Sequence, residues 1–371
     1  MKNVLILDNS KYVTGAGKSI ATFTRALAGK YKFYWAVTRS IPDNELAHLV
    51  GDNTYQRFEF VEISKRLGSN IRYLPQLLYN TYKLRRMISD HDISIVHVND
   101  CYNMCGVLVK ILNRKVRLVY HVRLLRTSFI GKLYSTFIGI IGRYSDAIIC
   151  CSNAVSNDVG PLSIRKQVIY DSEFFTEIED HDLPLKQAVK DIVYVGNILP
   201  GKGQDLAIKA FDLIRKQYPD LKLRFIGKFD HNEASVRFKE QLDVLIDDTM
   251  SKGHVAFEGF KYDIDDEIKK ADILLNLSES ESFSMVCLEA LKAGVPLVAS
   301  DCGGPAELFE HMRSGWLVPN RDFVAAAEAV NALIVNRSLR ERFSTEGKKY
   351  VFKNFNVWKN AKELNRLYDS V

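Results

Sequence analysis

The sequence predicts an α/β protein built from two doubly wound domains. Short apolar runs alternate with helical stretches along the whole chain, and this alternation is typical of parallel sheets covered by helices. At 371 residues the chain is also long for one hydrophobic core. We therefore expect two Rossmann-like domains of about 170 to 190 residues each.

The expected strands form two groups along the chain. Those of the first half are residues 3–7, 33–37, 93–98, 117–122 and 147–151, and those of the second half are 191–196, 222–227, 254–260, 272–277 and 296–300. The groups predict an N-terminal domain over residues 1–170 and a C-terminal domain over residues 191–355. The acidic segment 171–190 lacks a clear periodicity and is the expected linker. We expect residues 356–371 to form a helix that packs back on the N-terminal domain.

The net charge of +6 is unevenly distributed. Residues 1–170 carry 24 Lys and Arg against 11 Asp and Glu, a net +13, whereas residues 171–371 carry 27 against 34, a net −7. An anionic partner of the first half is expected, such as phosphate groups or a membrane surface. Segments 71–87 and 123–144 mix basic, aromatic and apolar residues, and are either interfacial helices or ordinary amphipathic helices with solvated basic faces. Nucleic acid is disfavoured because no recognition motif accompanies the charge.

The composition, with 47% hydrophobic and 26% charged residues, is typical of a soluble globular protein. No charge-free apolar run approaches the ~20 residues of a membrane span, and the first ten residues resemble a buried strand rather than a signal peptide. The six cysteines lack zinc-like spacing, which favours reduced, structural thiols. We expect a cytoplasmic protein, with a peripheral position on the inner face of the cell membrane as the alternative.

A glycine-rich segment, TGAGKS, follows the first expected strand. A phosphate-binding P-loop would need a glycine five residues before Gly17, where the chain has Tyr12, so an ATPase is disfavoured. Gly15 and Gly17 instead lie between a strand and a helix expected at about residues 17–29, where backbone can approach a ligand. The alternative is a plain tight turn.

Asp263 and Asp265 form a short acidic motif of the kind with which many enzymes hold a divalent cation. Here they stand in the first turn of a short expected helix, where they cap the helix and offset its dipole. We therefore assign no metal ion and no cofactor to this chain.

Two glutamates in the second half, Glu281 and Glu289, are separated by seven residues across an expected loop and helix. Ser284 is the expected N-cap of this helix, which starts near Met285, and its N-terminus suits a diphosphate. One carboxylate can then bind a hexose hydroxyl and the other a ribose hydroxyl. The plain alternative is a solvated acidic loop and a surface glutamate.

Lys202 precedes another expected helix, where a cation can stabilise a departing diphosphate, although a single lysine in such a loop is usually solvated.

His121 ends an expected strand at the edge where doubly wound sheets bind ligands, and can donate to a sugar hydroxyl. His97 ends the preceding apolar run and is the alternative ligand. Both histidines can equally be structural.

Taken together, these residues resemble the retaining glycosyltransferases of family 4, whose GT-B architecture has two facing Rossmann-like domains with a cleft between them. The resemblance is distributed over the chain. Its most specific part runs from Glu281 through Phe283 to Glu289 and continues with Ala293-Gly294-Val295-Pro296. Weaker matches are the Gly15 to Gly17 loop, the strand ISIVHV, the strand ending in His121, the stretch SDAIICCS, the pair Ile226-Gly227 and the strand with Phe257-Glu258-Gly259.

The chain departs from the family pattern at three places. Asn197 replaces an arginine that binds the diphosphate, which leaves more of that work to Lys202. Ser284 replaces a glycine but can still offer its backbone N–H to phosphate. Asp171-Ser172 replaces an Asn-Gly pair that makes an interdomain contact.

The resemblance implies metal-independent transfer of a sugar from a nucleoside-diphosphate-sugar, with a UDP-sugar favoured, to an acceptor hydroxyl. Lys202 and the N–H groups from Phe283 to Met285 would hold the diphosphate, and Gly15, Gly17 and Asn197 would complete the donor site. Glu281 and His121 would contact the sugar, and Glu289 the ribose.

The expected acceptor is a sugar or a lipid-linked molecule in surface polysaccharide, lipopolysaccharide or glycolipid synthesis. The alternatives are a nucleotide-sugar epimerase of the same architecture and a binding subunit of weak or no activity, for which Asn197 is the support.

Overall fold

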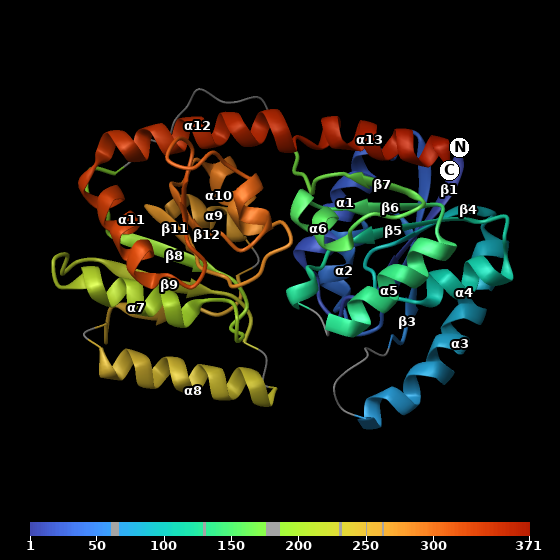
Figure 1. The fold of residues 1–371 in the computed structure, drawn as a ribbon, viewed down its shortest axis with the longest axis horizontal. Helices are drawn as coiled ribbons and strands as arrows, with labels where there is room; N and C mark the ends of the chain where they lie inside the picture. The colour runs from blue at the N-terminus through green and yellow to red at the C-terminus, as the bar shows by residue number, and fades with distance from the viewer. Residues whose placement is uncertain (61–66, 129–130, 176–185, 230–231, 250, 262) are drawn as a thin grey trace. The chain divides into compact units, whose positions relative to one another are not determined.

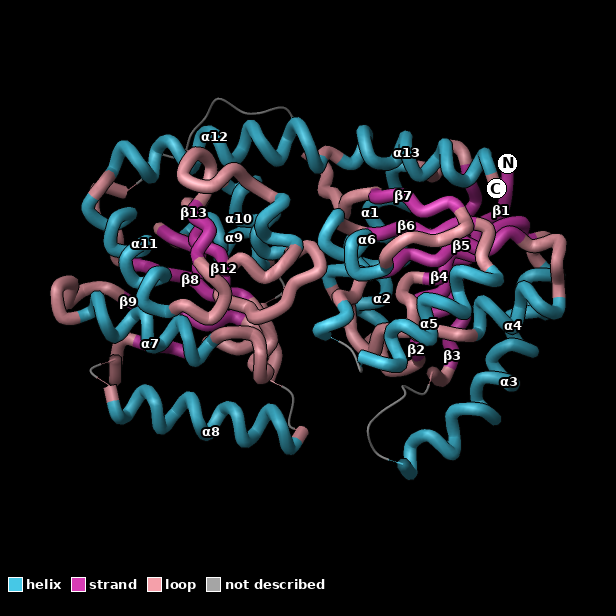
Figure 2. The backbone as a smooth tube through the Cα atoms, in the orientation of Figure 1, coloured by secondary structure: helices cyan, strands magenta, loops and turns pink. Residues whose placement is uncertain are grey.

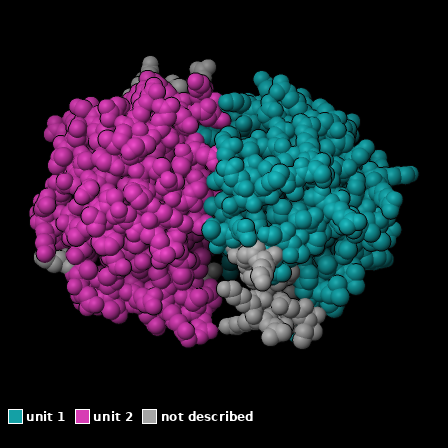
Figure 3. All heavy atoms as spheres, viewed as in Figure 1, with its two compact units in different colours: residues 1–174, 355–371 teal, residues 175–354 magenta. Residues whose placement is uncertain are grey.

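The computed structural model describes all residues except 61–66, 129–130, 176–185, 230–231, 250 and 262. Parts of the expected linker and of segment 123–144 therefore lie outside the described residues. The chain divides into two compact units (Figure 3). Unit 1 comprises Met1–Phe174 with Phe355–Val371, and unit 2 comprises Phe175–Asn354.

Within the described residues, unit 1 contains a seven-stranded parallel sheet with the order β3-β2-β1-β4-β5-β6-β7 (Figure 1). Its strands are β1 (Lys2–Asp8), β2 (Tyr31–Thr38), β3 (Thr54–Phe58), β4 (Ile93–Val98), β5 (Arg117–Val122), β6 (Ala147–Cys150) and β7 (Arg165–Val168). Its helices are α1 (Gly15–Ala26), α2 (Asp43–Val50), α3 (Leu67–Asp90), α4 (Cys105–Leu112), α5 (Gly131–Tyr144), α6 (Asn153–Val159) and α13 (Val357–Ser370), with a 3-10 turn η1 (Arg126–Ser128).

Unit 2 has, in its described part, a six-stranded parallel sheet with the order β10-β9-β8-β11-β12-β13. Strands are drawn in magenta in Figure 2. The strands are β8 (Asp191–Val195), β9 (Lys222–Ile226), β10 (Val255–Phe257), β11 (Ile273–Asn276), β12 (Leu297–Ser300) and β13 (Trp316–Val318). The helices are α7 (Gln204–Arg215), α8 (Glu233–Asp248), α9 (Ile264–Lys270), α10 (Met285–Ala293), α11 (Phe323–Val335) and α12 (Arg337–Phe355), with a 3-10 turn η2 (Gly304–Glu307).

The two parallel sheets confirm the predicted α/β class. The strands that the sequence did not indicate are β3, β7 and β13, because they are short and only partly buried and so lack a continuous apolar run. The prediction of a strand over residues 254–260 was too long, since β10 ends at Phe257. Asp263 caps α9 by accepting a hydrogen bond from the N–H of Asp266, as the sequence indicated.

Helix α13 belongs to unit 1, although it follows unit 2 in the chain. Its apolar face shares a core with β1 and β2, in which Val357, Leu364 and Leu367 are fully buried. The Tyr368 hydroxyl lies 2.6 Å from Nδ1 of His97 at the centre of the sheet. Unit 1 is therefore completed by the C-terminal end of the chain.

No helix in the described part of the chain is long and apolar enough to cross a membrane. All six cysteines are described; each is buried, and none forms a disulfide.

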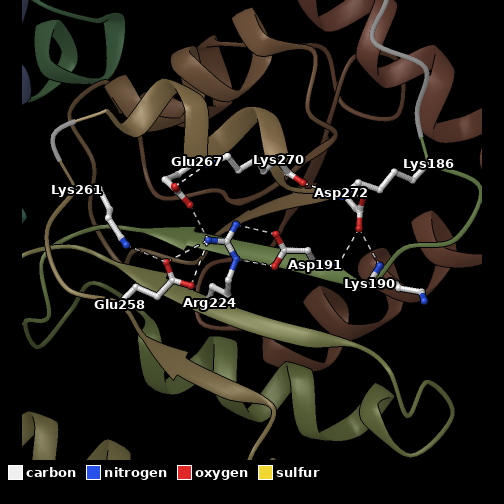
Figure 4. A network of polar contacts seen from close by, with 9 residues as sticks. All are labelled: Lys186, Lys190, Asp191, Arg224, Glu258, Lys261, Glu267, Lys270 and Asp272. Atoms are coloured by element: carbon white, nitrogen blue, oxygen red, sulfur yellow. Dashed lines mark hydrogen bonds and ion pairs between the residues drawn. The ribbon is translucent and has the colours of Figure 1, made fainter.

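A network of charged residues joins the neighbouring strands β8 and β9 of unit 2 to α9 (Figure 4). Arg224 of β9 points its guanidinium at Asp191 of β8, with nitrogen to oxygen distances of 2.7 and 2.8 Å. On the other side it contacts Glu267 of α9 at 2.9 Å and Glu258 at 3.3 Å. Hydrogen bonds from Lys270 and Arg224 lower the pKa of Glu267. Arg224 thus neutralises carboxylates contributed by several elements.

Replacing Arg224 by methionine should lower the free energy of unfolding by about 2 kcal/mol at pH 7, between the values for exposed and fully buried ion pairs. The carboxylates would then face one another without their cation. The pKa of Glu267 is lower in the folded state than in the unfolded state. The ionised Glu267 therefore adds to the free energy of unfolding at pH values above its unfolded-state pKa. This stabilisation is lost as the pH falls through the folded-state pKa. The cost of the substitution should therefore shrink on acidification. Urea unfolding at pH 7 and in the acidic range measures both effects.

The matched control is Arg237→Met on α8, whose partner Glu233 is exposed and one helical turn away. Such pairs contribute only about 0.3 to 0.5 kcal/mol. Equal losses in the two variants would contradict the structural role of Arg224.

Candidate active site

An ion pair lies at the carboxyl edge of the sheet in unit 2. Lys202 stands in the loop between β8 and α7, and its Nζ is 2.7 Å from Oε1 of Glu281, which precedes α10. The Glu281 carboxylate raises the pKa of Lys202, so the ammonium group stays charged. The lysine side chain is 35% exposed and that of Glu281 18%, so the cation is accessible to a ligand. The sequence indicated both residues, and the structure brings them together.

Close backbone contact positions these two residues. Gly203 has a φ of 77°, and a Cβ there would lie 2.0 Å from the carbonyl oxygen of Leu277. The N–H of Glu279 donates to the carbonyl of Gly201 at 2.9 Å. The Lys202 loop therefore rests directly on the segment that leads from β11 to Glu281.

Glu281 is held from its other side by the loop after β12. Its N–H donates to the carbonyl of Cys302 at 3.3 Å, and its carbonyl accepts from Gly304 at 2.8 Å. A Cβ at Gly304 would lie 2.3 Å from Cα of Phe283, so glycine is required at this crossing. The backbone of Glu281 is thus fixed between two loops, while its carboxylate faces Lys202.

Helix α10 begins at Met285, as the sequence indicated. Ser284 is its N-cap, and its hydroxyl accepts from the N–H of Cys287 at 3.4 Å. The serine has φ 81° and ψ 85°, a conformation that favours glycine. Phe283 and Met285 are buried on either side of it. The first turn of α10 therefore starts four residues after Glu281, the residue that pairs with Lys202.

Glu289 lies one turn inside α10 and is only 8% exposed. The prediction of an exposed surface glutamate, the plain alternative for this position, is therefore wrong. Its role toward a ribose stays a prediction.

Asn197, which stands where the family has arginine, fastens the start of the Lys202 loop. Its side-chain oxygen accepts from the N–H of Lys228 at 3.2 Å, and its carbonyl accepts from the buried side chain of Gln204 at 2.9 Å. Asn197 therefore has a structural role in linking the loops after β8 and β9.

In unit 1, Gly15 and Gly17 both lie in the first turn of α1, which begins earlier than the sequence indicated. Thr14 is the N-cap, and its hydroxyl accepts from the N–H of Gly17 at 3.2 Å. The two glycines thus form a helix N-terminus rather than an open loop.

His121 is the last but one residue of β5, which ends at Val122, and is 1% exposed. Its Nδ1 lies 3.2 Å from a guanidinium nitrogen of Arg123. Because arginine only donates, Nδ1 accepts and Nε2 carries the proton. Nε2 has no hydrogen-bond partner within the described residues. Burial, together with Arg123 and His97, holds the pKa of His121 well below its usual value, so the ring is neutral.

His97 packs beside His121, with ring centroids 5.4 Å apart, and is fully buried. Its Nδ1 is engaged by the Tyr368 hydroxyl, and burial followed by the Arg123 charge lowers its pKa to about 3. These contacts support the structural alternative for His97.

Sequence reasoning missed a buried polar network at the carboxyl edge of the unit 1 sheet. Arg123, after β5, pairs with Asp171 and donates to Asn99 at 2.6 Å. Ser19 donates to Asp171 at 2.7 Å, and Asn99 donates to Asp8 at 2.9 Å. The missed signal was positional, because Asp8, Asn99 and Arg123 each stand at or just after the end of an apolar strand.

Comparison with known families matches nearly the whole chain. Residues 13–170 match the family described as Glycosyltransferase Family 4, and residues 175–350 match Glycosyl transferases group 1. The N-acetyl-alpha-D-glucosaminyl L-malate synthase of Bacillus anthracis is 21% identical over 336 residues, covering 86% of each protein.

Solved structures show the same fold at low identity. Anabaena Alr3699/HepE in complex with UDP-glucose superposes with a TM-score of 0.83 at 19% identity, covering 100% of both chains. Staphylococcus aureus TarM, in a complex containing UDP, gives a TM-score of 0.80 at 12% identity over 99% of this chain and 100% of that one. The fold class is therefore GT-B, and the chain belongs to the retaining, metal-independent glycosyltransferases of family 4.

Proposed function

We propose that this glycosyltransferase moves a sugar from a UDP-sugar to an acceptor hydroxyl in surface polysaccharide, lipopolysaccharide or glycolipid synthesis. The observation that carries the proposal is the Lys202–Glu281 pair beside the first turn of α10. A charged lysine and a helix N-terminus both favour a diphosphate. The UDP-glucose bound to Anabaena HepE supports uracil as the base of the donor.

In the proposed mechanism, Lys202 exchanges its partner when the donor binds. The ammonium group turns from Glu281 to a diphosphate oxygen, and the N–H groups from Phe283 to Met285 contact the same group. Glu281 is then available to accept hydrogen bonds from the sugar hydroxyls. Glu289 binds the ribose. This arrangement matches each charge with a partner both before and after binding.

The transfer step needs no covalent intermediate on a side chain. The bond between the anomeric carbon and the phosphate oxygen breaks, and the acceptor oxygen forms the new bond on the same face of the sugar. The departing phosphate oxygen takes the acceptor proton. Lys202 and the N–H groups of α10 stabilise the negative charge that builds on the diphosphate, which is the main source of rate enhancement in such sites.

Residues of unit 1 complete the proposal. His121 carries an Nε2 proton that has no partner within the described residues, and we assign this group to a hydroxyl of the donor sugar. The N–H groups at the start of α1, near Gly15 and Gly17, would bind the donor as well.

Binding of nucleotide sugars tests the donor directly. A ligand that binds only the folded state raises the melting temperature, so UDP-, GDP- and ADP-sugars should be compared by thermal shift. We expect stabilisation by a UDP-sugar. Stabilisation by GDP- or ADP-sugars alone would overturn the base assignment, and no stabilisation by any of them would contradict the proposed function.

Replacing Lys202 by alanine should lower turnover by about two to three orders of magnitude, since one preorganised contact to a developing charge is worth roughly 3 to 4 kcal/mol. Release of UDP from the donor in the presence of acceptor provides the measurement. Lys216→Ala, at the exposed end of α7, is the control and should retain normal turnover. Near-normal turnover of Lys202→Ala would remove this residue from the mechanism.

The exposed face of α3 supports an acceptor at an anionic membrane surface. Leu74, Leu78 and Tyr82 recur every four residues and are 60%, 57% and 59% exposed. Arg85 and Arg86 are exposed in the same helix. Apolar and basic groups on one helix suit the boundary between anionic headgroups and acyl chains.

We expect the protein to co-sediment with vesicles that contain anionic lipid and to do so less with neutral vesicles. Leu78→Glu should reduce this binding, because it places a negative charge among the exposed apolar residues. Val244→Glu on α8 alters an equally exposed residue, 59% accessible, and should leave binding unchanged. Equal and negligible binding to both kinds of vesicle would count against membrane association.

A further inference from the structure

Tyr194 connects the two loops that carry the Lys202–Glu281 pair. It lies in β8 and is 1% exposed. Its hydroxyl accepts a hydrogen bond from the N–H of Leu277 at 2.9 Å and donates to the carbonyl oxygen of Lys202. One buried oxygen thus contacts the backbone of the lysine itself and the residue that follows β11.

The hydroxyl is fixed in place by its surroundings. The Tyr194 ring packs against Phe225 of β9, with ring centroids 5.5 Å apart. A Cβ on Gly203 would lie 3.0 Å from the Tyr194 hydroxyl, so the backbone at Gly203 passes close to this oxygen. Burial raises the pKa of Tyr194, which keeps the hydroxyl protonated and able to donate to Lys202.

The Tyr194 hydroxyl links the Lys202 loop to the segment that carries Glu281. Leu277 is four residues before Glu281, and the segment between them rests on Gly201 through the hydrogen bond from Glu279. The Lys202 backbone is therefore tied through Tyr194 to the same segment that presents Glu281. Losing the hydroxyl would leave a buried N–H and a buried C=O without this partner, and the two loops would move apart to find others.

We propose that Tyr194 is a positioning residue for diphosphate binding, whose hydroxyl sets the position of the Lys202 ammonium relative to Glu281 and the first turn of α10. The inference rests on the proposed role of Lys202 in holding the diphosphate. Tyr194 acts through Lys202 and does not touch the donor.

The substitution Tyr194→Phe tests the proposal, because it keeps the ring and removes only the hydroxyl. Isothermal titration with UDP should show an affinity about tenfold weaker than that of the wild type, the effect of roughly one lost hydrogen bond. With a saturating UDP-sugar donor, turnover should also fall about tenfold, since saturation cannot restore a misplaced cation.

Tyr218→Phe is the matched control in the same unit. Its hydroxyl donates to the side chain of Asn331 at 2.6 Å, which joins the segment between α7 and β9 to α11. Both variants lose a hydrogen-bonded hydroxyl and should lose thermal stability, but only Tyr194→Phe should lose UDP affinity. If both lower the melting temperature and neither changes UDP binding or turnover, Tyr194 is merely structural.

A double variant separates positioning through Lys202 from a general effect. If Tyr194 acts through the lysine, adding Tyr194→Phe to Lys202→Ala should cause no further loss of UDP affinity. Independent effects would multiply, and that result would overturn the proposal.

Inorganic pyrophosphate, titrated in parallel with UDP, distinguishes this inference from the proposed function. Binding of neither probe by the wild type would overturn the diphosphate site and the positioning role together. Binding by the wild type with unchanged affinity in Tyr194→Phe would overturn the positioning role alone.

Discussion

The chemistry of this protein depends on one constraint, which is that parallel strands end at the same edge of their sheet. In unit 2, β8 and β11 are neighbours, so the loops after them meet and bring Lys202 to within 2.7 Å of Glu281. In unit 1, β1, β4 and β5 are neighbours, and Asp8, Asn99 and Arg123 form a network at their ends. Polar groups distant in sequence thus gather at these edges without any local sequence signal.

The polar cluster around Arg123 in unit 1 is more deeply buried than the Lys202–Glu281 pair in unit 2. Arg123 and Asp171 have side chains only 3% and 6% exposed, so removing either partner would leave an unpaired buried charge. Lys202 is paired as well, but its side chain is 35% exposed, which leaves it accessible for the partner exchange that we propose. The first cluster is suited to holding the loops of unit 1 together, and the second to that proposed exchange.

Close backbone packing fixes the positions of Lys202 and Glu281. Gly203 and Gly304 occupy crossings where a side chain would collide with neighbouring backbone. Ser284 adopts a positive φ where the family has glycine, at a cost of about 1 kcal/mol or more. Its hydroxyl offsets part of this cost by capping α10. The glycine-to-serine departure therefore changes the local energetics, while the helix still begins at Met285, as the proposed diphosphate site requires.

The sequence by itself determined the features that arise from local patterns. Apolar runs alternating with helices predicted both parallel sheets, and capping chemistry placed Asp263 and Ser284 at helix starts. The sequence did not predict short, partly exposed strands such as β3 and β13. These strands bury too little apolar surface to show a continuous run of apolar residues.

Only the tertiary structure decided which residues meet. Lys202 and Glu281 are 79 positions apart, and the Tyr194 hydroxyl contacts Leu277 across 83 positions. The burial of His121 likewise depends on β5 lying inside the sheet. Such contacts follow from strand order and loop packing, which no local periodicity encodes.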